Sequence, residues 1–128
     1  IKSEGMLQQH KSLYMQMRDT IDRHPDKVFI LLTSPPLHPN RTTLEDAARA
    51  RALANWLGSD EFLAGHPNLF VFDFFDLLAD PETNMLRRDY QIDPESTDSH
   101  PNALANQTIG PLFVDFVDEA IRTYRASR

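Results

Sequence analysis

The chain opens with apolar residues at helical spacing and then passes into a short stretch that is apolar throughout. From Met6 to Ile21, apolar side chains return every three or four positions among polar ones, which predicts an amphipathic helix. This pattern stops before Pro25, because the residue that precedes a proline disfavours helical geometry. Residues 28–32 form a continuous apolar run, typical of a strand buried on both faces. The Pro35-Pro36 pair must end this strand, because proline cannot donate to a sheet ladder.

A second helix and a second strand follow in the same order. Thr42-x-x-Glu45 fits a capping box, and the alanines and leucines after it fall on one helical stripe until Gly58. Residues 60–64 predict one further helical turn. Residues 69–72 form another continuous apolar run, which predicts a second buried strand. Residues 74–78 are expected to form a short helix or an ordered loop.

The C-terminal part of the chain begins with a long irregular segment. Residues 80–101 show no periodicity and many turn-forming residues, and a loop of this length inside a compact domain is often functional. Asn102 is the expected N-cap of a last helix, whose apolar stripe runs from Ile109 to Tyr124. Gly110-Pro111 lies inside this stripe, so we expect the helix to kink or restart there.

The alternation of helices and strands predicts an α/β domain with a parallel sheet between helices, over residues 1–128. Only two strands are predicted, however. A two-stranded parallel sheet cannot bury three amphipathic helices and also protect both of its edges. We therefore expect further strands from N-terminal sequence outside this chain, from a second chain or from a homo-oligomer.

Composition narrows the possible functions. Lys and Arg total 13 and Asp and Glu total 19, and the resulting net charge of −6 argues against a broad nucleic-acid footprint. The chain has no cysteine, which excludes disulfides, thiolate metal sites and a cysteine nucleophile. No apolar stretch approaches the roughly 18 residues of a membrane-spanning helix. No metal site and no cofactor are expected, because the sequence lacks a His-x-x-x-His pair and a glycine-rich phosphate loop.

The strongest candidate for chemistry is Asp98-Ser99-His100-Pro101-Asn102. Pro101 favours extended geometry at His100, and residues two apart in an extended segment point to the same side, about 6.5–7 Å apart at Cα. The Asp98 carboxylate can then reach the His100 imidazole, as the acid and the base of a nucleophilic triad do. Four histidines precede a proline, however: His24, His38, His66 and His100. The His-Pro pair therefore also indicates turns in this chain, and His24, His38 and His66 are expected to be turn residues.

A triad also needs a nucleophile and an oxyanion hole. The sequence has no Gly-x-Ser-x-Gly elbow. Ser34 lies at the end of the first strand, where α/β folds place functional groups. Its neighbours are Thr33 and Pro35, and proline has no amide to offer an oxyanion, so the strand-ending turn is the favoured interpretation of Ser34.

Three further groups of residues have both a functional and a structural interpretation. Asp73, Asp76 and Asp80 could share a face and bind a metal, but a role as a helix cap or on a solvated face is favoured. The two arginines could hold an anion, but a surface role is favoured. The aromatic residues could line an acyl pocket, but a core role is favoured. These groups are Asp73, Asp76 and Asp80; Arg87 and Arg88; and Trp56, Phe70, Phe72, Phe74 and Phe75.

Taken together, these residues resemble the C-terminal half of an SGNH (GDSL-type) hydrolase. The resemblance covers nearly the whole chain and is most specific in the last block. It rests on Tyr14-x-x-Met17-Arg18 leading to His24-Pro25, the strand Phe29 to Thr33 with Pro35-Pro36, the strand Leu69 to Asp73, and Asp98-Ser99-His100-Pro101-Asn102 entering the final helix.

The resemblance implies a flavodoxin-like fold with about five parallel strands between helices. It also implies hydrolysis of a small acyl or acetyl ester through a Ser-His-Asp acyl-enzyme route, with His100 as the base and Asp98 as the acid. The family usually has Asp-x-x-His, but position 97 here is Thr97. Asp93 and Glu95 are therefore alternative acids.

The family's Gly-Asp-Ser block, glycine block and Gly-x-Asn-Asp block are absent from this sequence. We therefore expect the nucleophile and the oxyanion hole outside these 128 residues, in the remaining part of a larger domain or in a second chain, and no activity from this part alone. Analogy with the family suggests secretion or a periplasmic location. The alternative is a non-catalytic α/β binding or assembly module whose open sheet edge another chain completes.

Overall fold

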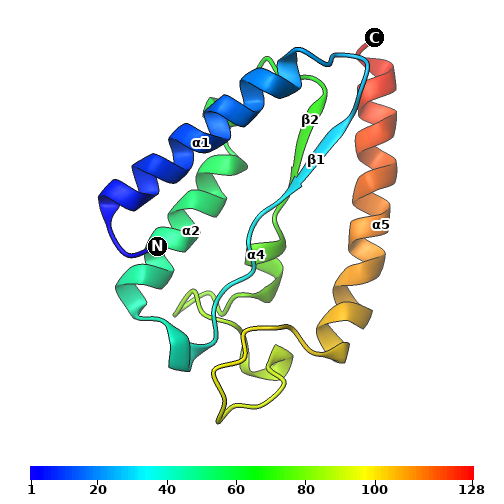
Figure 1. The fold of residues 1–128 in the computed structure, drawn as a ribbon. Helices are drawn as coiled ribbons and strands as arrows, with labels where there is room; N and C mark the ends of the chain where they lie inside the picture. Colours follow the sequence, from blue (N-terminus) through cyan, green and yellow to red (C-terminus); the bar gives the residue numbers. More distant parts are fainter.

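The computed structural model describes residues 1–128, and its helices and strands alternate along the chain (Figure 1). Most elements lie where the apolar pattern predicts them, and two short 3₁₀ helices, η1 and η2, add order to the loops. The elements are α1 (Glu4–Asp22), β1 (Phe29–Leu32), η1 (Pro39–Arg41), α2 (Leu44–Leu57), α3 (Asp60–Leu63), β2 (Leu69–Phe72), α4 (Phe74–Leu78), η2 (Arg88–Tyr90) and α5 (Ala103–Ala126).

The two strands form one parallel sheet, in which Phe29 lies opposite Leu69 and Leu32 lies opposite Phe72. Figure 1 shows α1 and α2 on one side of the strands and α5 on the other. This three-layer arrangement confirms the α/β class and the parallel sheet between helices. No helix is both long enough and apolar enough to cross a membrane.

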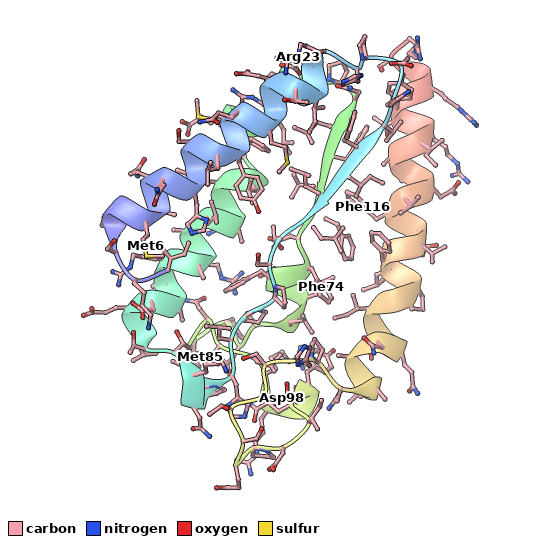
Figure 2. The ribbon with its side chains drawn as sticks, in the orientation of Figure 1. Met6, Arg23, Phe74, Met85, Asp98 and Phe116 are labelled. Carbon is pink, nitrogen blue, oxygen red and sulfur yellow. The ribbon has the colours of Figure 1, made fainter.

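Side chains of each strand alternate between the two faces and so build two cores. Towards α1 and α2, the first core consists of Ile21, Trp56, Leu57, Phe62 and Leu69, with Leu31 and Val71 packed against it. Towards α5, the second consists of Phe72, Leu78, Leu86, Tyr90, Ala105 and Ile109. Phe113 and Phe116 meet Phe72 edge to face, with ring centroids 5.1 and 5.2 Å apart. Figure 2 shows Phe116 pointing from α5 towards the strands. A core role is therefore confirmed for Trp56, Phe72 and Phe75, and Phe74 packs against the second core. Phe70 is only half-buried.

The helix α5 is continuous through Pro111, so the expected restart at Gly110-Pro111 is wrong. A proline in a helix interior removes one backbone hydrogen bond and costs about 3 kcal/mol. The apolar stripe continues across this point, with Ile109 before the proline and Phe113 and Phe116 after it. Burial of each large apolar side chain contributes about 1.5–3 kcal/mol, so packing of both halves on the sheet outweighs the proline.

The N-cap of α2 is Thr43, so the predicted Thr42-x-x-Glu45 capping box is displaced by one residue. The Thr43 hydroxyl accepts a hydrogen bond from the Asp46 amide at 3.1 Å. Asp46 then pairs with Arg49 at 2.7 Å, and the Arg49 guanidinium donates to the carbonyl of Ile1 at 2.9 Å. The later cap thus lets the first turn of α2 hold the N-terminal residues.

The outer edge of β1 has no partner strand (Figure 1). The Phe29 amide donates to the Asn68 carbonyl at 2.8 Å, and the Thr33 amide donates to the Phe72 carbonyl at 3.1 Å. Peptide groups alternate in direction along a strand, so those of Ile30 and Leu32 point away from β2. Leu32 is also 46% exposed. The sheet therefore ends at an open, apolar edge.

Candidate functional site

The loop before α5 brings Asp98 and His100 together. Nδ1 of His100 lies 2.6 Å from Oδ1 of Asp98, and the His100 amide donates to the same oxygen at 3.0 Å. Both strands end on this side of the molecule, and Figure 2 shows Asp98 in the loop beyond them, near the start of α5. The expected contact between Asp98 and His100 is therefore present, on the side where α/β folds place functional groups. The bond from the His100 amide to the Asp98 side chain is that of an Asx turn, which helps to bring the two side chains together.

The hydrogen bond with Asp98 fixes the orientation and the tautomer of the His100 imidazole. Because an aspartate carboxylate only accepts, Nδ1 of His100 carries the proton of this bond, and neutral His100 has its lone pair on Nε2. Nε2 has no hydrogen-bond partner, and the His100 side chain is 88% exposed. The hydrogen bond from the His100 amide, followed by the one from its imidazole, lowers the pKa of Asp98 below 3.8. Asp98 therefore remains a carboxylate.

Asp98 is the carboxylate that contacts His100, and the two alternative acids do not. Oδ1 of Asp93 accepts from the Glu95 amide at 2.9 Å, and the Asp93 carbonyl accepts from Ser96. Neither carboxylate forms a hydrogen bond or an ion pair with His100. The Asp-x-His spacing, one residue shorter than the Asp-x-x-His of SGNH hydrolases, thus still leaves an aspartate in contact with the histidine.

The loop that holds this pair is fastened to the segment after β1 by His38. The His38 ring is buried, with 1% of the residue exposed. Its Nδ1 accepts from the Asn40 amide at 3.1 Å, and its Nε2 lies 3.1 Å from the Asp93 carbonyl. The His38 amide donates to Oγ of Ser99 at 2.9 Å. His38 caps the η1 turn, as expected for a turn residue. It also joins two distant loops, a role that the sequence pattern does not predict.

Two asparagine side chains complete the support of this loop. Asn40 donates to the carbonyls of Pro94 and Ser96 at 3.2 and 3.0 Å. Asn102, the confirmed N-cap of α5, donates to the carbonyls of Asp89 and Gln91 at 2.9 and 3.1 Å. Each asparagine is the last residue of a His-Pro-Asn triplet, at 38–40 and at 100–102. The same triplet also occurs at 66–68, where Asn68 donates to the carbonyls of Ile21, His24 and Lys27. The triplet therefore indicates an asparagine that holds a loop in place, and it does not by itself distinguish His38.

A separate cavity of about 220 Å³ opens beside the carboxyl end of β1. Ser34 lines it, and three alanines of α2 form one wall: Ala47, Ala50 and Ala54. Neither Asp98 nor His100 lines this cavity. The structure therefore does not bring Ser34 and His100 together in one pocket.

The three aspartates and Arg87 each form hydrogen bonds or ion pairs within the fold. Asp73 caps α4 and accepts from the Thr33 hydroxyl, Asp76 pairs with Arg51, and Asp80 accepts from the Glu82 amide in a turn. No group of three or more side chains that could hold a metal ion is present. Arg87 pairs with Asp89 at 2.9 Å, and that hydrogen bond raises the pKa of Arg87. Arg87 is thus engaged by a neighbouring carboxylate.

A second histidine–aspartate pair lies at the opposite end of the strands. Nδ1 of His66 lies 2.7 Å from Oδ1 of Asp22, where α1 ends. The His66 side chain is 19% exposed, against 88% for His100. His66 lies before β2, and its pair with Asp22 therefore links helix to strand, away from the carboxyl ends of the sheet.

Comparisons with protein-family models, with curated proteins and with solved structures found no match to this chain.

Proposed function

We propose that this chain supplies the general base and its orienting acid to an ester hydrolase of the SGNH type. The observation that carries the proposal is the 2.6 Å hydrogen bond between Nδ1 of His100 and Asp98, which leaves Nε2 of His100 free. A base with an oriented imidazole and an unoccupied outer nitrogen is what activation of a serine hydroxyl requires. The resemblance of residues 98–102 to the last sequence block of that family supports the same assignment.

The reaction would proceed in two transfers. His100 Nε2 takes the proton of a serine hydroxyl while that oxygen attacks the ester carbonyl, and the imidazolium then gives this proton to the departing alcohol. Water next attacks the acyl-serine, and His100 again accepts a proton and returns it to the serine oxygen. Asp98 holds the tautomer of His100 and stabilises the imidazolium in both transfers. The serine and the oxyanion donors come from polypeptide outside these residues.

The open edge of β1 is where that polypeptide would join. A strand that pairs with the peptide groups of Ile30 and Leu32 in parallel to β1 would end on the same side as the Asp98 loop. In parallel sheets, residues that follow adjacent strands meet at the carboxyl edge. A serine after such a strand is therefore suited to meet His100. This extension would give the flavodoxin-like sheet that the resemblance implies.

The test uses the complete polypeptide, or the complex that contains this chain. A fluorophosphonate probe followed by intact-mass measurement should add one label, on a serine outside residues 1–128. His100→Ala should lower ester hydrolysis about 10²–10⁴-fold, the range for loss of a general base. His66→Ala is the matched control, because it removes an imidazole from the other histidine–aspartate pair. Full activity of His100→Ala, or equal losses in both variants, would refute the proposal.

The open edge of β1 also favours a second function, a binding or assembly module without catalysis. Main-chain pairing at an exposed edge is a common mode of peptide recognition. The two functions differ in the probe experiment. A folded monomer of 14.7 kDa that has no longer precursor and takes no label would favour the module. A labelled serine on additional sequence would favour the hydrolase.

A further inference from the structure

We infer that His38 is a positioning residue for the Asp98–His100 pair. It holds the loop that carries the pair through its hydrogen bonds with Ser99 and with the Asp93 carbonyl. This inference rests on the proposed function, because it concerns the geometry of the proposed base. His38 lies after β1, and the pair lies before α5, so the assignment joins two parts of the chain that the sequence does not place together.

The first contact of His38 is with Ser99, the residue between Asp98 and His100. Ser99 lies between the two residues, and its Oγ accepts from the His38 amide at 2.9 Å. The neighbouring Asp98 carboxylate accepts from both the amide and the ring of His100. A shift of Ser99 would therefore move the backbone that carries both members of the pair.

The His38 ring fastens the other end of the same loop. Its Nε2 lies 3.1 Å from the Asp93 carbonyl, which also accepts from Oγ of Ser96 at 3.0 Å. The same Ser96 oxygen accepts from the Asp98 amide at 3.0 Å. A hydrogen-bonded path thus leads from the ring of His38 through Asp93 and Ser96 to Asp98, in addition to the direct contact with Ser99.

The tautomer of His38 is determined by its two partners. The Asn40 amide donates to Nδ1, so this nitrogen carries no proton, and Nε2 carries the proton that Asp93 accepts. His38 and His100 therefore have opposite neutral tautomers, one with the proton on Nε2 and the other on Nδ1. Nitrogen-15 NMR distinguishes these two forms, which gives a readout for each histidine in one spectrum.

The test is a set of side-chain replacements that separate the two contacts of the ring. His38→Gln keeps an amide near the position of Nε2 as a donor to Asp93, whereas His38→Asn keeps an oxygen near Nδ1 as an acceptor for Asn40. His38→Ala removes both. Ser99→Ala removes the acceptor for the His38 amide, and Ser99→Thr restores a hydroxyl. His66→Ala is the control for loss of an imidazole elsewhere.

The readouts in the 128-residue chain need no substrate. In the wild type, we expect the proton of neutral His100 on Nδ1 and an Asp98 carboxyl that titrates below its ordinary range. His38→Ala and Ser99→Ala should give His100 a mixture of tautomers and raise the Asp98 pKa towards its ordinary value. His38→Gln and Ser99→Thr should restore both signals, because they restore donation to Asp93 and the Ser99 acceptor.

In the complete enzyme, misplacement of the pair should lower kcat about 10²-fold for His38→Ala with KM little changed. The inference is wrong if His38→Ala and Ser99→Ala both leave the His100 tautomer and the Asp98 titration as in the wild type. If His38→Ala does not fold, His38→Gln, Ser99→Ala and Ser99→Thr still decide the matter. Failure of the proposed function has a different signature, because His100→Ala would then keep full activity whatever the NMR signals show.

Discussion

The hydroxyl of Thr33 donates a hydrogen bond to Oδ1 of Asp73 at 3.0 Å and so joins the first residue after β1 to the first residue after β2. The same hydroxyl oxygen accepts from the Phe75 amide at 2.8 Å. Thr33 is buried, with 2% of the residue exposed. One side chain therefore ties the carboxyl ends of both strands to the start of α4.

Thr33→Val should destabilise the chain by about 1–3 kcal/mol, because the similar shape fills the space but leaves the buried Phe75 amide without its acceptor. Urea unfolding measures the difference. Thr33→Ser is the control, since it keeps the hydroxyl and loses only a methyl group, and it should retain most of the stability. Equal losses for valine and serine at this position would show that packing, not the hydrogen bond, is what matters there.

Asp98 should contribute stability that depends on pH. Hydrogen bonds from the amide and the ring of His100 lower the folded-state pKa of Asp98 below the ordinary 3.8. The contribution is therefore present above the unfolded pKa and is lost as the pH falls through the folded pKa. Wild type and Asp98→Asn should differ in stability at neutral pH and converge in acid. Glu95→Gln is the control for net charge, and a constant difference at every pH would contradict the expectation.

Two glycines should respond to alanine with opposite signs. A Cβ at Gly110, inside α5, would meet no atom within 4 Å, so Gly110→Ala should stabilise the chain by about 0.5–1 kcal/mol. Gly65 has φ of +84°, where an L side chain is strained, so Gly65→Ala should destabilise it by about 1–2 kcal/mol. Thermal or urea unfolding measures both. A loss of stability from Gly110→Ala would show that α5 needs flexibility next to Pro111.

Leu32→Lys should block extension of the sheet without disturbing the isolated chain. Leu32 is 46% exposed, so a surface lysine should change the stability of the 128-residue chain by no more than about 0.5 kcal/mol. In the complete polypeptide or complex, a strand beside β1 would cover this position, and lysine is a common guard against such pairing. Urea unfolding of the complete protein should show a loss of stability, or co-purification should show a loss of binding of the second chain. Unchanged behaviour in both settings would mean that no strand joins this edge.

The elements that the sequence predicts well are those whose cause is local. The stripe of α1 and the apolar runs of β1 and β2 lie within a few residues of the predicted bounds. The contact between Asp98 and His100 is predictable from their two-residue spacing, and its cause is also local, because the Asp98 side chain accepts from the His100 amide as in an Asx turn.

The sequence predictions are wrong or incomplete where distant or competing contacts determine the structure. Thr42 and Thr43 can both cap a helix, and the structure uses the second, whose neighbour Asp46 is held by Arg49. Pro111 stays inside α5 because aromatic residues on both strand and helix pack across it. The sequence pattern predicts only a turn at His38. Its contacts with Asp93 and Ser99 are not predicted, because these residues lie 55 and 61 positions away in the chain.

That separation of 61 residues also bears on how the chain folds. The hydrogen bond between His38 and Ser99 closes a loop that contains α2, the β2 strand and α4. The entropy of closing a loop grows with its length, and contacts between distant residues form slowly. Asp98 and His100 are two residues apart, so we expect their contact to form early and the contact with His38 to form late. Refolding should therefore restore secondary structure before it restores the contact between His38 and Ser99, and stopped-flow measurements should separate the two phases.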